Sequence, residues 1–258
     1  MNVRIRVIKV LALELLLSIV LFSCNEKDAE YKTQLLQTSD GLTITAEVYE
    51  AQPNAPVILL FHQARFSRGE YRSIAPRLKA LGFTCISIDQ RSGDEVNGVK
   101  NKTFVEATEK GLGTQYVDAF PDLELLLKYA RKTYPDQKVL VWGSSYSASL
   151  ALVLASEYPA DVSAVLAFSP GAYFEFKGKS IAAHAESLEC PVFMTSSRDE
   201  VPDRMEIFNA IPHEDKSYFV PELEGYHGSK ALWPEHEGNE YYWGAVEAFL
   251  EKLKPATS

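Results

Sequence analysis

The sequence is poor in the residues that build metal sites and in positive charge. Its 258 residues include only three cysteines and five histidines. These show no ligand spacing, and neither an HExxH motif nor a paired CxxC motif occurs, so we expect no metal site and no cofactor. Lys and Arg number 26 against 35 Asp and Glu, which gives a formal net charge of −9. Because such a surface repels nucleic acid, no nucleic-acid partner is expected.

The chain also has no internal repeat and no long low-complexity linker. Hydrophobic residues make up 46% and charged residues 24%, a composition that can bury a large core. We therefore predict a single domain over residues 34–255. Strand and helix candidates alternate through it, which favours an α/β fold with a mostly parallel central sheet and helices on both faces. The expected strands are residues 57–62, 83–88, 138–142, 163–168, 191–195 and 216–220, and the expected helices are residues 70–81, 116–132, 146–157 and 240–253.

Two features complete this outline. Residues 34–37 and 42–49 flank a Ser-Asp-Gly turn signal, which predicts an antiparallel hairpin at the sheet edge. Only residues 169–190 separate the strand candidates at 163–168 and 191–195. That stretch is long enough for one helix and a loop, so no large cap domain is expected.

The first residues lack the length expected of a membrane-spanning helix. Three basic residues precede an apolar stretch at residues 10–22, which one glutamate and one serine interrupt. The sequence LFSC that follows resembles a bacterial lipobox. The resemblance implies a signal peptide at residues 1–23, lipidation of Cys24, and a short tether at residues 24–33. It places the protein in the bacterial cell envelope, periplasmic or surface-exposed; an ordinary cleaved signal and an uncleaved anchor are the alternatives.

Loss of this leader changes the charge of the chain. Residues 1–23 contain three basic residues and one acidic residue, so their removal leaves 23 basic and 34 acidic residues and a net charge of −11. Attachment to the membrane is therefore expected to rest on the acyl chains of Cys24, without help from a basic patch.

One serine stands between a buried strand and a buried helix. Residues 139–142 form a continuous apolar run, Gly143 ends it, and an apolar helical pattern begins at Ser147. Because almost no loop separates the two elements, Ser145 is expected to adopt a strained backbone conformation and to project from the sheet edge. The segment GSSYS resembles the G-x-S-x-G nucleophile elbow of α/β hydrolases, with Ser147 in place of the second glycine.

A serine hydroxyl becomes a nucleophile only with a base beside it and an acid that orients the base. In the chain order of the α/β hydrolases the acid follows the serine and the histidine comes last. The resemblance therefore assigns the acid to Asp199, in the loop after residues 191–195, with Glu200 and Asp203 as competitors. It assigns the base to His227, after residues 216–220, with His236 as the rival.

The negative charge that develops during acyl transfer calls for backbone N–H donors. The resemblance assigns one donor to Tyr146, the residue after the nucleophile. The second lies in the loop that begins at His62, which resembles the His-Gly-x segment of the family. By that correspondence Ala64 donates its amide, and Gln63 is the fallback because its side chain also carries a donor.

Within the superfamily, the stretch from about residue 31 to residue 253 resembles the small dienelactone-hydrolase-like esterases. The lactone hydrolases of that group use a cysteine nucleophile, whereas this chain has Ser145. The difference favours a general serine carboxylic-ester hydrolase that acts on a small-molecule ester. A peptidase of the same fold, and a catalytically silent hydrolase fold that serves as an envelope binding protein, are the alternatives.

If Cys24 is lipidated, two cysteines remain. The strand order that the resemblance implies separates Cys85 and Cys190 by four strand steps, roughly 19 Å at ~4.8 Å per step. A disulfide needs Cα atoms within ~7 Å. We therefore predict two free, mostly buried thiols.

Overall fold

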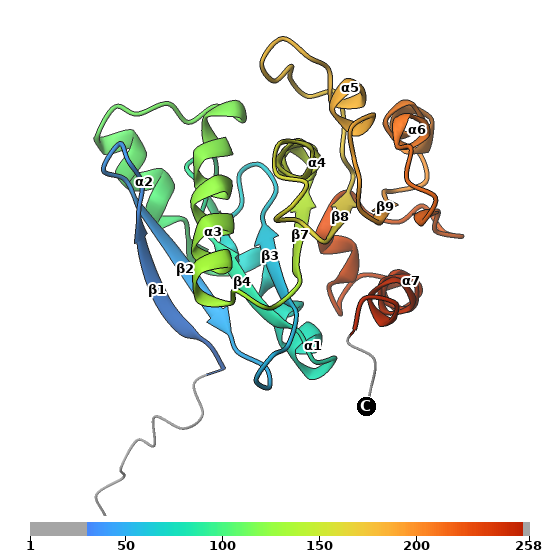
Figure 1. The fold of residues 1–258 in the computed structure, drawn as a ribbon, viewed down its shortest axis with the longest axis horizontal. Helices are drawn as coiled ribbons and strands as arrows, with labels where there is room; N and C mark the ends of the chain where they lie inside the picture. The colour runs from blue at the N-terminus through green and yellow to red at the C-terminus, as the bar shows by residue number, and fades with distance from the viewer. Residues whose placement is uncertain (1–29, 255–258) are drawn as a thin grey trace, which may run out of the picture.

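A computed structural model describes residues 30–254, so the predicted signal peptide, most of the tether and the lipidation site at Cys24 lie outside the described residues. Eight strands form one sheet in the order β1-β2-β4-β3-β7-β8-β9-β10. Strand β1 pairs antiparallel with β2, β2 pairs antiparallel with β4, and the remaining pairs are parallel. The predicted hairpin therefore forms, and β1 lies at the sheet edge (Figure 1).

The bounds of the strands follow the apolar runs of the sequence. The sheet contains β1 Lys32–Gln37, β2 Thr43–Tyr49, β3 Val57–Phe61, β4 Thr84–Ile88, β7 Val139–Ser144, β8 Ala164–Phe168, β9 Val192–Thr195 and β10 Lys216–Phe219. Every residue of β3, β4, β7, β8 and β9 is buried, as expected of parallel strands covered on both faces.

Helices cover both faces of the sheet. They are α1 Ala75–Ala80, α2 Lys102–Glu109, α3 Phe120–Thr133, α4 Tyr146–Glu157, α5 Ile181–Ala185, α6 Val201–Ala210 and α7 Asn239–Glu251. Helices α3, α4, α5 and α6 lie on one face, and α1 and α7 lie on the other (Figure 1). The two cores meet β3 from opposite sides: Leu59 and Phe61 belong to the first, Ile58 and Leu60 to the second.

Several short elements differ from the sequence-based expectation. The helix expected at residues 70–81 is two pieces, the 3₁₀ helix η2 Arg68–Tyr71 and then α1, which begins with a proline in its first turn. Helices α2 and α6 and the small hairpin of β5 Glu95–Val96 and β6 Val99–Lys100 were not expected. Further 3₁₀ turns lie at η3 Val117–Ala119 and η4 Ser229–Leu232. Between β8 and β9 only α5 and loops occur, so the described residues contain no cap domain there.

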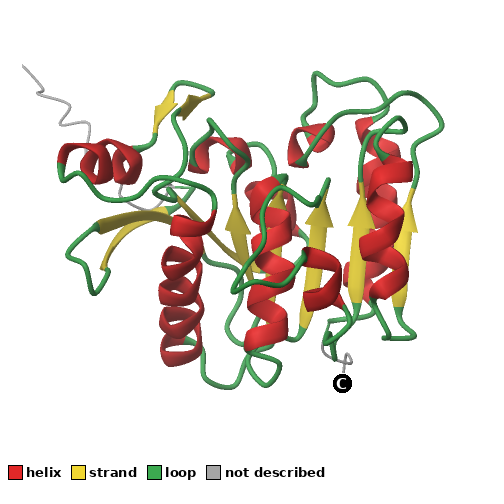
Figure 2. Cartoon of the chain, turned by 90° about the horizontal axis from the view of Figure 1, so that it is seen from above, coloured by secondary structure: helices red, strands yellow, loops and turns green. Residues whose placement is uncertain are grey.

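The carboxyl ends of the parallel strands all lie on the same side of the sheet, and the loops that follow them lie close together there (Figure 2). The loops after β3, β7, β9 and β10 carry the candidate site residues singled out in the sequence. In open parallel sheets the carboxyl ends of the strands are where sites form.

Candidate active site

Ser145 occupies the strained turn that the sequence predicts. Strand β7 ends at Ser144 and α4 begins at Tyr146, so Ser145 alone joins them. Its φ of 60° and ψ of −124° lie outside the conformations that L-residues ordinarily adopt. A Cβ on Gly143 would lie 2.2 Å from the Ser147 carbonyl oxygen, so only glycine fits there. The expected strained turn at Ser145 is confirmed, and Ser145 is 7% exposed.

Ser147, which stands where the family motif has glycine, is itself used in the structure. It is fully buried. Its hydroxyl accepts the Ser144 N–H at 3.0 Å and lies within donating distance of the carbonyl oxygens of Phe61 at 2.6 Å, His62 at 2.8 Å and Ser144 at 2.9 Å. The hydroxymethyl group that Ser147 adds therefore links the elbow by hydrogen bonds to the end of β3.

His227 is paired with a carboxylate. Its Nδ1 lies 2.5 Å from Glu200 Oε1. The other carboxylate oxygen, Oε2, accepts the Ser169 hydroxyl at 2.7 Å, and Arg204 donates to Oε1 at 3.0 Å. Burial alone would raise the pKa of Glu200, but the hydrogen bonds from His227 and Ser169 hold that pKa at about 2. The carboxylate is thus ionised and fixed against the imidazole.

The structure pairs His227 with Glu200 and not with Asp199, the acid that the family resemblance assigned. Asp199 is exposed, and within residues 30–254 its side chain makes no hydrogen bond to a histidine. Asp203 is exposed as well, in the first turn of α6. The turn before α6 directs Glu200 inward to the end of β8, where Ser169 lies, and leaves Asp199 facing solvent. Glu200, one of the two competitors weighed from the sequence, is the residue that meets His227.

The four other histidines have different partners. His62 is fully buried, its Nε2 accepts the Gln90 N–H at 3.0 Å, and burial lowers its pKa to about 4. His184 bonds Ser156 and the Phe176 carbonyl group. His213 accepts a backbone N–H from Asp215. His236, the rival to His227, lies against the Lys230 carbonyl oxygen and stacks on Tyr226.

Hydrogen bonds donated by backbone N–H groups hold the loops around Ser145 and His227 together. The Ser145 N–H donates to the Phe168 carbonyl oxygen at 2.7 Å, at the end of β8. Beyond His227, the Gly228 N–H donates to Ser169 Oγ at 2.9 Å and the Ser229 N–H donates to Ser144 Oγ at 2.8 Å. In the part of the chain that the structure describes, no hydrogen bond joins Ser145 Oγ to His227 directly.

The two expected oxyanion donors are free of protein acceptors. Across residues 30–254, neither the Ala64 N–H nor the Tyr146 N–H donates to another protein group. The Gln63 N–H, by contrast, donates to Glu70 Oε2 at 2.7 Å and points into the protein. Of Gln63, the fallback, only the side-chain amide therefore remains to donate to an oxyanion. The Oε1 atom of that side chain is buried without a partner. The Tyr146 hydroxyl donates to the Ser92 carbonyl oxygen at 2.9 Å and so steadies the elbow.

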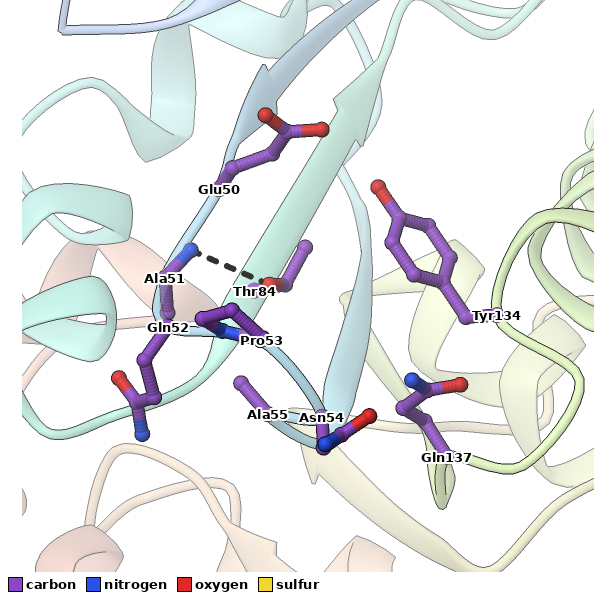
Figure 3. Close-up of a pocket in the computed structure, with 9 residues that line it drawn as sticks. All are labelled: Glu50, Ala51, Gln52, Pro53, Asn54, Ala55, Thr84, Tyr134 and Gln137. Carbon is purple, nitrogen blue, oxygen red and sulfur yellow. Dashed lines mark hydrogen bonds between the residues drawn. The ribbon is translucent and has the colours of Figure 1, made fainter.

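A hollow of about 350 Å³ lies elsewhere, and Figure 3 shows the residues that line it. Its wall includes Ala55 and Thr84, which lie where β3 and β4 begin, and Gln137, which lies just before β7. The Ala51 N–H donates to Thr84 Oγ1 across this wall. Because the hollow is at the amino ends of the parallel strands, it is at the opposite edge from Ser145 and is not the reaction site.

No group of three or more His, Cys, Asp or Glu side chains within residues 30–254 is placed to hold a metal ion. No helix formed by these residues is long and apolar enough to cross a membrane.

One family model matches a large part of the sequence. The sequence model of the hydrolase family described as serine aminopeptidase, S33, matches residues 52–186, just over half of the chain. The match includes the loop after β3 and the nucleophile elbow, and it ends before Glu200 and His227. The pair of Glu200 and His227 therefore lies beyond the matched residues. Among curated proteins, none matches the sequence.

Solved structures of α/β hydrolases share the fold at low sequence identity. An esterase from Pyrococcus furiosus is 17% identical with a TM-score of 0.66, covering 88% of this chain and 92% of its own. A dienelactone hydrolase from Anabaena variabilis is 14% identical with a TM-score of 0.68, covering 88% and 100%. A monoglyceride lipase from Saccharomyces cerevisiae is 12% identical with a TM-score of 0.64, covering 90% and 97%. The predicted α/β-hydrolase fold is confirmed.

Proposed function

The chain belongs to the serine aminopeptidase S33 family of α/β hydrolases, and we propose that it is a serine hydrolase that cleaves carboxylic esters through an acyl-enzyme intermediate. The observation that carries this proposal is the placement of a strained serine, Ser145, at the same sheet edge as a histidine that is paired with a carboxylate.

In the proposed reaction Ser145 Oγ attacks the carbonyl carbon of the ester while His227 Nε2 accepts the hydroxyl proton. Glu200 holds Nδ1 at 2.5 Å, which fixes the ring orientation and stabilises the imidazolium. The N–H groups of Ala64 and Tyr146 bind the oxygen that becomes negative. His227 then returns the proton to the leaving alcohol. Water, activated by the same imidazole, releases the acyl group from Ser145.

Esters are favoured as substrates by the proteins that share the fold, because three of them are named as an esterase, a dienelactone hydrolase and a monoglyceride lipase. The description of the family supports a second candidate, the cleavage of an aminoacyl amide by the same serine. Both reactions pass through an acyl-enzyme on Ser145, so substrates distinguish them and the mechanism does not.

A substrate panel with a matched variant tests the proposal. We expect the protein to hydrolyse p-nitrophenyl acetate or butyrate faster than aminoacyl p-nitroanilides. The variant Ser145→Ala is expected to lower the ester rate by roughly 10⁴- to 10⁶-fold while unfolding at the same temperature as the wild type. Faster anilide cleavage would favour the peptidase, and no turnover of either class would favour a silent binding protein. An unchanged ester rate in the variant would overturn the assignment of Ser145.

We further propose that the protein is tethered to the bacterial cell envelope by acyl chains on Cys24. The support is the basic start, the apolar stretch at residues 10–22 and the LFSC sequence that ends at Cys24. The acidic balance of the chain, 35 acidic against 26 basic residues, gives no electrostatic help in binding anionic lipid, so in this proposal attachment rests on the acyl chains.

A further inference from the structure

A second glutamate lies beneath the candidate site and takes no part in the proposed reaction. Glu70 belongs to η2 and is fully buried, with 0% of its surface exposed. A buried ionisable carboxylate costs stability unless its oxygens are well bonded, so the partners of this one indicate its use.

Each carboxylate oxygen of Glu70 holds a different catalytic loop. Oε2 accepts the Gln63 N–H at 2.7 Å, in the loop that carries Ala64. Oε1 accepts the Ser144 hydroxyl at 2.7 Å, in the residue immediately before Ser145. Strand β4 and helices α1, α2 and α3 lie between the two loops in the chain, yet one side chain bonds to both.

The third loop is joined through Ser144. Its Oγ donates to Glu70 and at the same time accepts the Ser229 N–H at 2.8 Å, two residues beyond His227. The main chain of Glu70 adds a further tie, because its carbonyl oxygen accepts the Trp233 indole N–H at 2.9 Å. Glu70 thus links three segments: the loop that carries Ala64 (the oxyanion loop), the nucleophile elbow at Ser145, and the loop that carries His227 (the histidine loop).

The bond to Gln63 also decides which amide faces the substrate. Because the Gln63 N–H turns inward to Glu70, that peptide cannot serve as the oxyanion donor, and the next N–H in the chain, that of Ala64, is left without a protein acceptor. Loss of the carboxylate would release the Gln63 peptide and let the loop rotate, which would move the Ala64 N–H away from the reacting oxygen.

We propose that Glu70 is a positioning residue for ester hydrolysis, whose carboxylate sets the oxyanion loop, the elbow and the histidine loop in one mutual arrangement. The inference rests on the proposed function. It concerns how the transition state is stabilised, so the effect falls on kcat rather than on substrate binding.

Kinetics of Glu70→Gln, Glu70→Ala and the control Glu47→Gln test this inference. Glutamine still accepts the Gln63 N–H but no longer offers an acceptor oxygen to Ser144, so we expect kcat to fall by about 10-fold in Glu70→Gln and by about 10²- to 10³-fold in Glu70→Ala. KM for p-nitrophenyl butyrate is expected to change by less than about 3-fold. Glu47 is equally buried and binds Arg68 and Arg72 instead of a catalytic loop, so Glu47→Gln should affect stability and leave kcat near the wild-type value.

A double-mutant cycle isolates the link through Ser144. Because Ser144→Ala and Glu70→Gln break the same contact, their effects on kcat should be less than additive when combined. Full additivity, or a wild-type kcat in folded Glu70→Gln, would overturn the positioning role. Failure of the proposed function is a separate result, because it appears either as no ester hydrolysis by the wild type or as ester hydrolysis that survives in Ser145→Ala.

Discussion

At the scale of single residues, the turn before α6 decides which of two neighbouring carboxylates meets His227. Asp199 and Glu200 are neighbours, and a short carboxylate just after a strand suits the family pattern better. The backbone before α6 nevertheless turns Glu200 to His227 and Asp199 to solvent. The direction of the two side chains depends on where α6 begins. The sequence does not show that starting point, because α6 has no clear apolar period.

Replacing each carboxylate separately distinguishes the two residues. We expect Glu200→Gln to lower kcat for ester hydrolysis by about 10²- to 10⁴-fold, because a neutral amide neither fixes the imidazole nor stabilises the imidazolium. Asp199→Asn is expected to retain a rate within about 2-fold of the wild type. Steady-state rates of both variants on one ester give the answer, and a larger loss in Asp199→Asn would contradict the assignment of Glu200.

The buried Glu70 carries a pH dependence of stability with a definite sign. Burial raises its pKa to about 7, against the lowering effect of the hydrogen bonds from Ser144 and Gln63. Other titratable or charged groups interact with the Glu70 carboxylate. Lys230 from η4 lowers the pKa of Glu70, and Tyr71 and Tyr146 lie within electrostatic reach of it. The folded state binds the proton more tightly than the unfolded state, so stability falls as the pH rises from about 4.5 to about 7.

The variant Glu70→Gln should remove this dependence. Relative to the variant, the wild type is expected to lose about 3 kcal/mol of unfolding free energy between pH 4 and pH 8. Urea unfolding at a series of pH values measures the difference. A difference between the two proteins that does not vary with pH would show that Glu70 has an ordinary pKa in the folded state.

At the scale of elements, apolar pattern predicted the strands and the main helices well. Residues 146–157 were expected as a helix and α4 has those bounds, because a buried helix between two apolar strands leaves little freedom. Helix α6 was missed because Val201–Ala210 contains a proline and several charged residues with little apolar period. The role of Glu70 was also invisible, since its partners come from loops brought together only by the closed sheet.

Ser147 gives a test at the junction of β7 and α4. Restoring the family glycine with Ser147→Gly removes the hydroxyl that meets the carbonyl groups at the end of β3 and leaves the Ser144 N–H without its acceptor. We expect this variant to lose about 1–3 kcal/mol of unfolding free energy, from the lost hydrogen bonds and from glycine in a helix. Denaturant unfolding measures the loss, and a variant as stable as the wild type would show that the hydroxyl is dispensable.

At the scale of the whole molecule, the sheet order decides the state of the thiols. Cys85 lies in β4 and Cys190 just before β9, and β3, β7 and β8 lie between those strands. Both cysteines are free and buried, as predicted. Their pKa values are raised by burial, that of Cys190 to about 11, so neither is a ready thiolate at neutral pH.

The proposed anchor is tested in bacterial cells that express the full chain. We expect the wild type to incorporate labelled palmitate and to remain with membranes in high salt, because acyl chains hold it. Cys24→Ser should incorporate no label and should separate from membranes or keep an unprocessed leader. Labelling of the variant, or release of the wild type by salt alone, would rule out a lipid anchor at Cys24.

The most direct test of the account is active-site labelling with a fluorophosphonate, followed by peptide mapping of the labelled residue. This reagent bonds only to a serine whose hydroxyl is activated by a nearby base. We predict a single modification on Ser145, absent in Ser145→Ala and at least about 10²-fold slower in folded His227→Ala. Modification of another serine, or equal labelling in His227→Ala, would contradict the central claim that this histidine activates Ser145.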